Sequence, residues 1–230
     1  MSRGRLFHYF LIACVCFLAN AVVALNWPRT GGDWDSYGTV AENIYKGHGV
    51  SLSIAPPFQP DFGGNSFPGY PAFIAGVWSL SGKSDAAVRW AQAFLFAVSI
   101  GLFGICLERA FAGRAIGLVF AWLAALSPLT MAWSRSLQVE ALSMAGLLFY
   151  FSALLISFHE GRIRVLPISL AILFSLSLRT DAILLIVPLF SLFLVERETK
   201  RARCVKTGSV IAIVCIVMSI WFVRLSLIHI

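Results

Sequence analysis

The run of residues 6–25, LFHYFLIACVCFLANAVVAL, decides the class of fold. It contains no Asp, Glu, Lys or Arg over 20 residues. A helix of that length spans about 30 Å, the thickness of the hydrocarbon layer of a bilayer. The run is too long for the apolar part of an ordinary secretory signal, so it predicts an uncleaved first membrane span. Arg3 and Arg5 precede it and predict a cytoplasmic N-terminus, because cytoplasmic flanks of spans are enriched in basic residues.

The composition of the whole chain extends this prediction. Of the 230 residues, 59% are hydrophobic and only 13% are charged, and the mean hydropathy is +0.83. These values lie outside the range of soluble domains and predict a protein with several membrane spans. They also exclude a disordered chain and a conventional nucleic-acid-binding protein. The five cysteines are odd in number and four of them lie in apolar runs, so no disulfide framework is expected.

Residues 26–84 contain no run long enough to cross a membrane and are predicted to form an outer loop. Residues 36–46 place apolar side chains at helical spacing, as in an amphipathic helix that lies on a membrane surface. Residues 71–80 are apolar but too short to span. We therefore expect one or two interfacial helices within this loop.

Four further runs have the length and apolar character of spans: residues 86–107, 115–132, 139–158 and 208–223. The stretch 165–195 is 31 residues long and is interrupted near its middle by Arg179, Thr180 and Asp181. It is either one span with a buried ion pair or two short spans joined by a tight turn. The flanking segments 159–164 and 196–206 are both basic and share a side only if the chain crosses twice between them, which favours two spans.

The sequence therefore predicts an all-α, polytopic transmembrane bundle of about seven spans, forming a single domain over residues 1–230. With this topology the cytoplasmic segments hold eleven basic and four acidic residues, which accounts for the whole net charge of +7. The outer side is balanced, with seven of each. The positive charge thus indicates orientation rather than a polyanionic partner.

The densest group of chemically competent side chains is GGDWDSY, residues 31–37. A carboxylate of Asp33 or Asp35, shielded by Trp34 and Tyr37 at a membrane surface, has the character of a general base. The alternative is a solvated acidic loop that caps the following helix. Tyr37 and Tyr70 are equally well explained as interfacial anchors.

A second group consists of charged residues at or within outer span ends. Such charges are costly in a membrane, so they pair with each other or line a cavity. Arginines there would suit a lipid phosphate, whereas mutual neutralisation, as between Arg179 and Asp181, is the alternative. The charged residues of this second group are Arg89, Arg135, Glu140, Arg179, Asp181 and Arg224. The four histidines are scattered along the chain and suggest no metal site.

Several of these pieces, taken in order, are similar to the GT-C membrane glycosyltransferases, and most similar to the protein-mannosyltransferase and lipid A aminoarabinose-transferase type. The first pieces are D-x-x-x-Y-x-x-x-A-E-N-I from Asp33, G-H-G from Gly47, and FPGYPAFIA from Phe67. The later ones are LSP from Leu126, WSR from Trp133, Glu140, LSLRTD from Leu176, and WFVR from Trp221.

The resemblance implies an inverting transfer of a sugar from a polyprenyl-phosphate donor to a lipid, glycan or protein acceptor, on the outer face of a bacterial inner (plasma) membrane. It implies that Asp33 is the catalytic carboxylate, with Asp35 as the second choice. It needs no nucleotide sugar and leaves room for a divalent cation. The substrate-binding residues that it implies are Tyr37, Tyr70, Arg135, Glu140, Arg179 and Arg224.

Members of this family continue with a further outer loop and more spans, so the resemblance also implies that these residues form an N-terminal portion. Two other functions stay open. One is a transporter or flippase of a lipid-linked substrate, favoured by the interrupted stretch around Arg179. The other is an inactive, truncated remnant.

Overall fold

The computed structural model describes residues 3–26, 34–56, 68–111, 115–134, 137–195 and 198–228. In this part of the chain every regular element is a helix, which confirms the predicted all-α class. The helices are α1 (Arg3–Asn26), α2 (Trp34–Tyr45), α3 (Gly69–Ser81), α4 (Asp85–Ala110), α5 (Ile116–Ala125), α6 (Pro128–Ser134), α7 (Glu140–Glu160), α8 (Val165–Leu178), η1 (Thr180–Leu185), α9 (Ile186–Leu189), η2 (Phe190–Leu194) and α10 (Lys200–Ile228).

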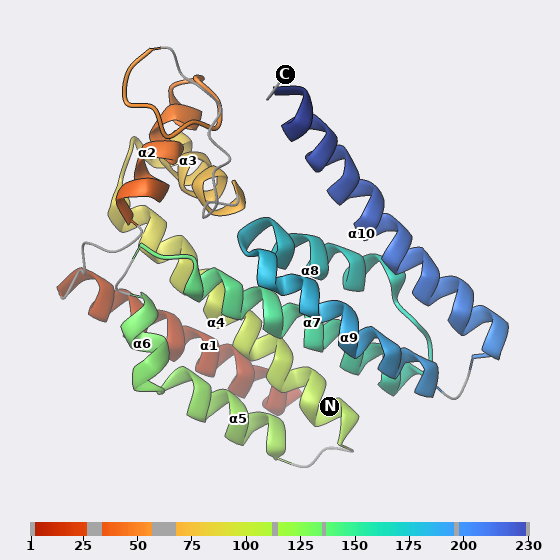
Figure 1. Cartoon of the computed structure of the whole chain (residues 1–230). Coiled ribbons are helices and arrows are strands. Elements are labelled where there is room, and N and C mark those ends of the chain that lie inside the picture. Colours follow the sequence, from red (N-terminus) through yellow and green to blue (C-terminus); the bar gives the residue numbers. More distant parts are fainter. Residues whose placement is uncertain are drawn as a thin grey trace.

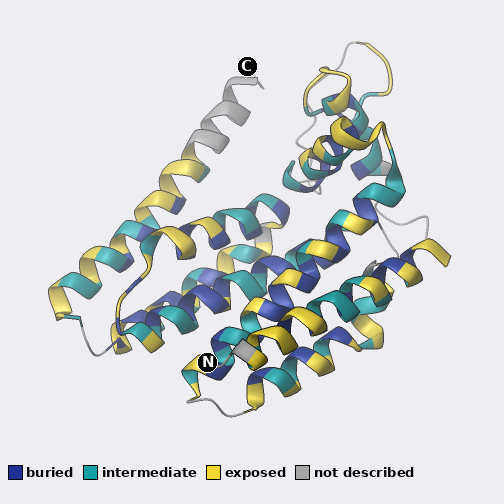
Figure 2. Cartoon of the chain, turned by 180° about the vertical axis from the view of Figure 1, so that it is seen from behind, coloured by how far each residue is buried: buried dark blue, intermediate teal, exposed yellow. Residues whose placement is uncertain are grey.

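Four of the described helices contain segments long and apolar enough to cross a membrane: Gly4–Asn26, Asp85–Ala110, Glu140–Glu160 and Lys200–Ser219. Within an apolar stretch of 18 residues in each segment, half of the residues are buried in the second and third segments, against 17% in the fourth. Accordingly α4 and α7 pack against each other at the centre of the bundle, and the part of α10 up to residue 219 is mostly exposed or only partly buried (Figure 2).

The predicted span over residues 115–132 is divided into two helices, α5 and α6, which meet at Ser127 and Pro128. Proline lacks the backbone N–H that a continuing helix would need, and it disfavours helical geometry in the residue before it. Thr130 donates hydrogen bonds to the carbonyls of Ala124 at 3.1 Å and Ser127 at 2.8 Å, which satisfies carbonyls at this break.

The interrupted stretch 165–195 is a helical hairpin. The chain runs along α8, reverses at Arg179, whose backbone is extended, and returns through η1, α9 and η2 beside α8 (Figure 1). Its two ends meet: the Ile163 N–H donates to Glu198 Oε1 at 2.8 Å. The hydroxyl of Tyr150 on α7 holds the returning arm by donating to the Leu185 carbonyl at 2.7 Å. This confirms the two-segment alternative.

The ends of the helices alternate between two sides of the bundle (Figure 1). One side, which we call the Arg179 end, holds α2, α3, the start of α7 and the reversal of the hairpin. The opposite end holds the start of α1, the end of α4 and the start of α10. This alternation has the order that seven crossings require, although α5, α8 and the segment Asp181–Leu194 are shorter than a full span. The number seven and the cytoplasmic N-terminus stay predictions.

Opposite the Arg179 end, an acidic side chain joins two helices. Glu108 of α4 is 3% exposed and accepts hydrogen bonds from Arg5 Nη1 at 2.5 Å and from the Tyr9 hydroxyl at 2.6 Å. At the adjoining contact, a Cβ on Gly117 of α5 would overlap the Gly104 carbonyl of α4. Close packing of small residues is typical of helix pairs in membranes. These contacts fix the scaffold on which the other end is built.

Candidate functional site

Arg179 is the centre of the candidate site. It is the first residue after α8, and its extended backbone carries the side chain past the end of that helix. Its Nε donates to Asp181 Oδ1 at 3.0 Å, and its Nη2 lies 3.0 Å from Asp181 Oδ2. On its other side, Nη1 lies 3.9 Å from Oε1 of Glu140, the first residue of α7. The predicted pairing of Arg179 with Asp181 is therefore present.

This ion pair is accessible rather than sealed in the core. The side chains of Arg179 and Asp181 are 43% and 59% exposed. Exposed ion pairs contribute at most about 1 kcal/mol to stability. The guanidinium can therefore exchange the Asp181 carboxylate for another anion at low cost.

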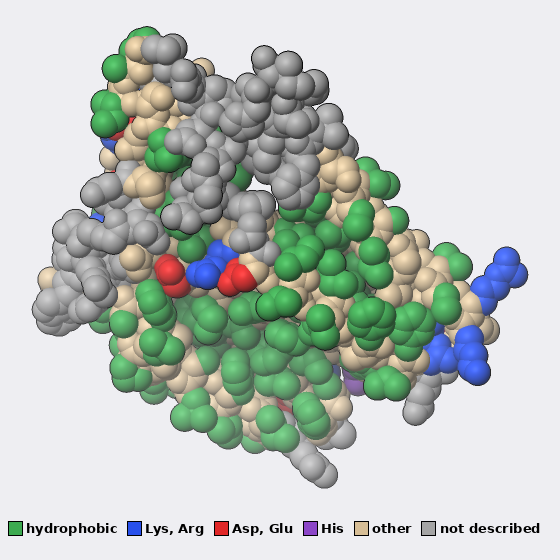
Figure 3. Space-filling model, viewed as in Figure 1, with side chains coloured by type: hydrophobic (Ala, Val, Ile, Leu, Met, Phe, Trp, Pro, Cys, Tyr) green, Lys and Arg blue, Asp and Glu red, His purple; other side chains and the backbone are tan. Residues whose placement is uncertain are grey.

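A pocket of about 450 Å³ lies beside these charges. Its charged end is formed by Glu140, Arg179 and Asp181, and the rest of its wall is mostly apolar. Figure 3 shows a small group of acidic and basic side chains within an otherwise hydrophobic face. Such a pocket suits an amphiphilic ligand with an anionic head. Its remaining lining comes from Leu129, Trp133, Ser143, Met144, Leu147, Ser175, Ala182, Leu184 and Leu185.

Tyr37 and Tyr70 were both predicted to belong to the site, and the structure brings them together behind Glu140. Their rings make an edge-to-face contact, with centroids 5.0 Å apart and an interplanar angle of 86°. Tyr70 is fully buried and Tyr37 is 7% exposed. The hydroxyl of Tyr70 lies within electrostatic range of Glu140 and Arg89 and faces Gln92. The aromatic pair therefore belongs to a buried cluster near Glu140, and neither ring is among the residues that line the pocket.

The placement of Tyr70 depends on Gly69. A Cβ at Gly69 would lie 2.5 Å from the Ser177 carbonyl carbon, so only glycine allows α3 to approach α8 this closely. The preceding Pro68 is the N-cap of α3. This short turn thus fixes Tyr70 next to the end of α8, where Arg179 follows.

Helix α2 is held by charges on its exposed side. Glu42 lies 2.8 Å from Lys46 Nζ and 3.0 Å from Lys83 Nζ, and Lys83 also lies over the Trp78 ring, 5.5 Å from its centroid. Hydrogen bonds from Lys46 and then from Lys83 hold the pKa of the Glu42 carboxyl below its usual value. Asn43 donates to the Ser51 carbonyl at 2.6 Å. The helix that follows Asp33 therefore packs on α3 and is linked to the turn between α3 and α4.

The model of the family described as dolichyl-phosphate-mannose-protein mannosyltransferase matches residues 63–221, well over half of the chain. The chain belongs to this family. Its membership confirms the resemblance to the GT-C membrane glycosyltransferases and indicates a membrane glycosyltransferase. No curated protein and no solved structure matches the chain significantly.

The stretch that matches the mannosyltransferase family contains Tyr70, Arg135, Glu140 and Arg179. The structure brings Tyr70, Glu140 and Arg179 together, whereas Arg135 lies outside the described residues. The other predicted site residues, which fall outside the matched stretch, are Asp33, Asp35, Tyr37 and Arg224. Asp33 lies outside the described residues. Asp35 belongs to α2 and Arg224 to α10, but their side chains are not described.

Sequence reasoning missed several residues in or near the candidate site. Ser143 lines the pocket one turn after Glu140, and their spacing of three residues on one helix could have indicated it. Arg89 was singled out as a charge at a span end but was not assigned to the site. Gln92 follows Arg89 by one turn on α4, and a single amide in an apolar helix does not by itself indicate a functional site.

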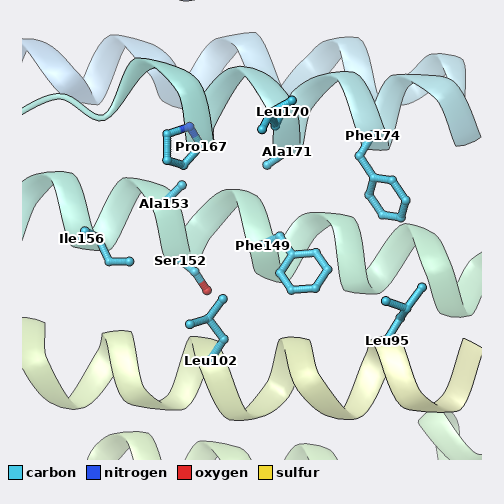
Figure 4. Close-up of a pocket in the computed structure, with 10 residues that line it drawn as sticks. All are labelled: Leu95, Leu102, Phe149, Ser152, Ala153, Ile156, Pro167, Leu170, Ala171 and Phe174. Carbon is cyan, nitrogen blue, oxygen red and sulfur yellow. The ribbon is translucent and has the colours of Figure 1, made fainter.

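No group of three or more His, Cys, Asp or Glu residues that could hold a metal ion occurs within the described ranges. A second pocket, of about 360 Å³, lies between α4, α7 and α8. Leu95, Phe149 and Phe174 are among its apolar lining residues, and Ser152 supplies its one hydroxyl (Figure 4). That hydroxyl already donates to the Leu148 carbonyl at 2.7 Å. This pocket suits hydrocarbon and offers no reactive group.

Proposed function

We propose that this protein transfers a sugar from a polyprenyl-phosphate donor to an acceptor, with inversion at the anomeric carbon. The reaction would take place at the Arg179 end of the bundle, which we assign to the outer face of the membrane. One observation carries the proposal: Arg179 lies, accessible to an anion, at the charged end of a mostly apolar pocket. A donor of this class has the same two parts, a phosphate and a hydrocarbon chain. The pocket and the family membership support the same chemistry.

Arg179 is the residue that we assign to the donor phosphate. Its planar guanidinium can donate two parallel hydrogen bonds to phosphate oxygens, as it now does to the carboxylate of Asp181. The apolar wall around Leu147 and Leu184 would take the first units of the chain. Arg135 and Arg224 are further candidates for the phosphate.

Asp33 is the proposed general base, and Asp35 is the second candidate. Asp33 immediately precedes α2, whose Tyr37 packs on Tyr70 beside Glu140. The carboxylate would take the proton of an acceptor hydroxyl while its oxygen forms a bond to the anomeric carbon. The bond from that carbon to the phosphate oxygen breaks, and its electron pair leaves with the phosphate. Arg179 would stabilise the negative charge that develops there.

Transport of a lipid-linked substrate is the second candidate function. The hairpin with a charged reversal favours it, because interrupted helices often line the binding sites of transporters. Transport moves the substrate across the membrane without changing its covalent linkage, whereas transfer cleaves that linkage. The two functions are therefore separable in a single preparation.

The test uses the protein reconstituted in vesicles with polyprenyl-phosphate mannose, the sugar that the family description names, and polyprenyl-phosphate aminoarabinose in a parallel sample. Lipid, glycan and peptide acceptors are supplied and products are identified by mass. A glycosylated acceptor together with free polyprenyl phosphate supports the proposal. Movement of intact donor between leaflets without cleavage would instead establish transport.

A further inference from the structure

We infer that Gln92 is a positioning residue. Its buried amide fixes the start of α7 so that Glu140 stays at the limit of ion-pairing distance from Arg179 and makes no hydrogen bond to it, which leaves the guanidinium available to the donor phosphate. This inference rests on the proposed function, because it concerns the same phosphate. It assigns a role to a residue that does not line the pocket.

Gln92 connects two segments that are far apart in the sequence. It lies on α4 and is fully buried. Its Nε2 donates to the carbonyl of Gln138 at 3.0 Å. Gln138 lies two residues before Glu140, and its neighbours Leu137 and Val139 are buried in the cluster that also contains Tyr70. The apolar neighbours hold the connection in place, and the directional hydrogen bond from Gln92 sets its orientation.

The same amide lies within interaction range of the Tyr70 hydroxyl on α3. The Oε1 of Gln92 and the hydroxyl of Tyr70 are both buried, and neither has a partner of good hydrogen-bond geometry among the described residues. The buried Nε of Arg89, one turn earlier on α4, also lacks a hydrogen-bond partner among the described residues. Buried polar atoms without partners are rare, and where they gather they often mark a functional site. A polar layer thus lies directly behind Glu140.

Glu140 stands between this layer and the pocket. Its Oε1 lies 3.9 Å from Arg179 Nη1, which is beyond hydrogen-bonding distance. Its Oε2 is buried and has no hydrogen-bond partner among the described residues. A carboxylate that moved about 1 Å closer would form a charge-assisted hydrogen bond with Arg179 and would compete with a phosphate there. The position of the α7 start therefore controls how strongly Arg179 can bind an anion.

The experiment measures the dissociation constant of polyprenyl phosphate, without a sugar, for the protein in lipid nanodiscs. Gln92→Leu keeps the volume of the side chain and removes both polar atoms. We expect it to weaken binding by about three- to tenfold, because Glu140 is then free to close on Arg179. The matched control is Ser99→Ala, which removes a buried hydroxyl from the same helix whose hydrogen bond stays within α4, to Phe96. We expect the control to bind as the wild type does.

A double-mutant cycle with Glu140→Gln separates positioning from general damage to the structure. If Gln92 acts through Glu140, then Gln92→Leu should have no further effect on binding once the carboxylate is gone. An equal loss of affinity in both backgrounds would overturn the inference. So would wild-type affinity in the Gln92→Leu protein.

If Gln92→Leu does not fold, Gln92→Met answers the same question, because it also removes both polar atoms of the amide that binds Gln138. It should weaken binding when Glu140 is present and have no effect in the Glu140→Gln background, and equal binding by all of these proteins would overturn the inference. A wild-type protein that binds no polyprenyl phosphate would overturn the proposed function itself, and this inference with it. The wild-type measurement thus separates the two failures.

Discussion

Nη1 of Arg179 lies 3.9 Å from Oε1 of Glu140, while Nε and Nη2 of the same guanidinium contact the carboxylate of Asp181. Two acids from different segments therefore flank one arginine at the mouth of a pocket. Asp181 is hydrogen-bonded to it, whereas Glu140 is within ion-pairing distance but beyond hydrogen-bonding distance. Under the proposed function, the affinity of the site for a phosphate depends on how these two carboxylates share Arg179.

Arg179→Ala should weaken the binding of polyprenyl phosphate by about ten- to a hundredfold, because it removes charge-assisted hydrogen bonds. Arg179→Lys should recover only part of the loss, since an ammonium group lacks the planar pair of donors. Titration of the nanodisc-embedded variants with the lipid measures both. Wild-type affinity in Arg179→Lys would show that charge alone is sufficient.

Asp181→Asn should strengthen the binding of polyprenyl phosphate by up to about fivefold. The carboxylate competes with the phosphate for Arg179, but this exposed pair contributes at most about 1 kcal/mol. The same titration measures the change. Its control is Glu160→Gln, which removes the carboxylate of another exposed ion pair, with Arg164 near the opposite end of the bundle. Weaker binding by Asp181→Asn would show that Asp181 orients Arg179 instead of competing for it.

Tyr150→Phe should destabilise the hairpin by about 1 to 3 kcal/mol, because it leaves the Leu185 carbonyl without the buried hydroxyl that now binds it. Thermal unfolding in detergent measures the change. Tyr70→Phe is the matched comparison, since its buried hydroxyl has no partner of good hydrogen-bond geometry within the described part of the chain. We expect little change in its melting temperature. Equal losses in the two variants would contradict the assigned hydrogen bonds.

The stability of the α2 region should depend on Glu42 at acidic pH. Lys46 and Lys83 hold the pKa of Glu42 below its usual value in the folded protein. The stabilisation is therefore complete above the pKa of the unfolded chain, and it is lost as the pH falls through the lower folded-state pKa. Glu42→Gln should remove this part of the pH dependence. Thermal unfolding at a series of pH values below 6 measures the difference, which is small because the pairs are exposed. Parallel curves for the two proteins would exclude the effect.

The sequence predicted the hairpin because charge gave independent information. The basic segments before and after the stretch 165–195 had to lie on the same side of the membrane, which required the chain to reverse at Arg179. The hydrogen bond between the Ile163 N–H and Glu198 confirms that the two ends of the stretch meet. The division between α5 and α6 was missed, although Pro128 was visible, because the apolar run continues through it. Hydropathy gives the length of an apolar run but does not show whether one helix continues through it, whereas a proline inside the run predicts a break in the helix.

The candidate site was only partly predictable. Charges such as Arg179 and Glu140 are conspicuous in an apolar chain, because each is costly in a membrane. Gln92 and Ser143 are ordinary polar residues, and their importance depends on which neighbours lack partners, which only the packing of α3, α4 and α7 reveals. A pattern along one helix does not contain that information.

The most direct test of the account measures the rate at which a labelled sugar passes from polyprenyl phosphate to an acceptor, using the reconstituted wild type, Asp33→Asn, Asp35→Asn and Arg179→Ala. We expect transfer by the wild type, loss of most of the rate in Asp33→Asn with donor binding retained, and loss of both rate and binding in Arg179→Ala. Asp35→Asn separates the two neighbouring acids and should keep most of the rate. Wild-type transfer by Asp33→Asn and Arg179→Ala would contradict the proposed mechanism.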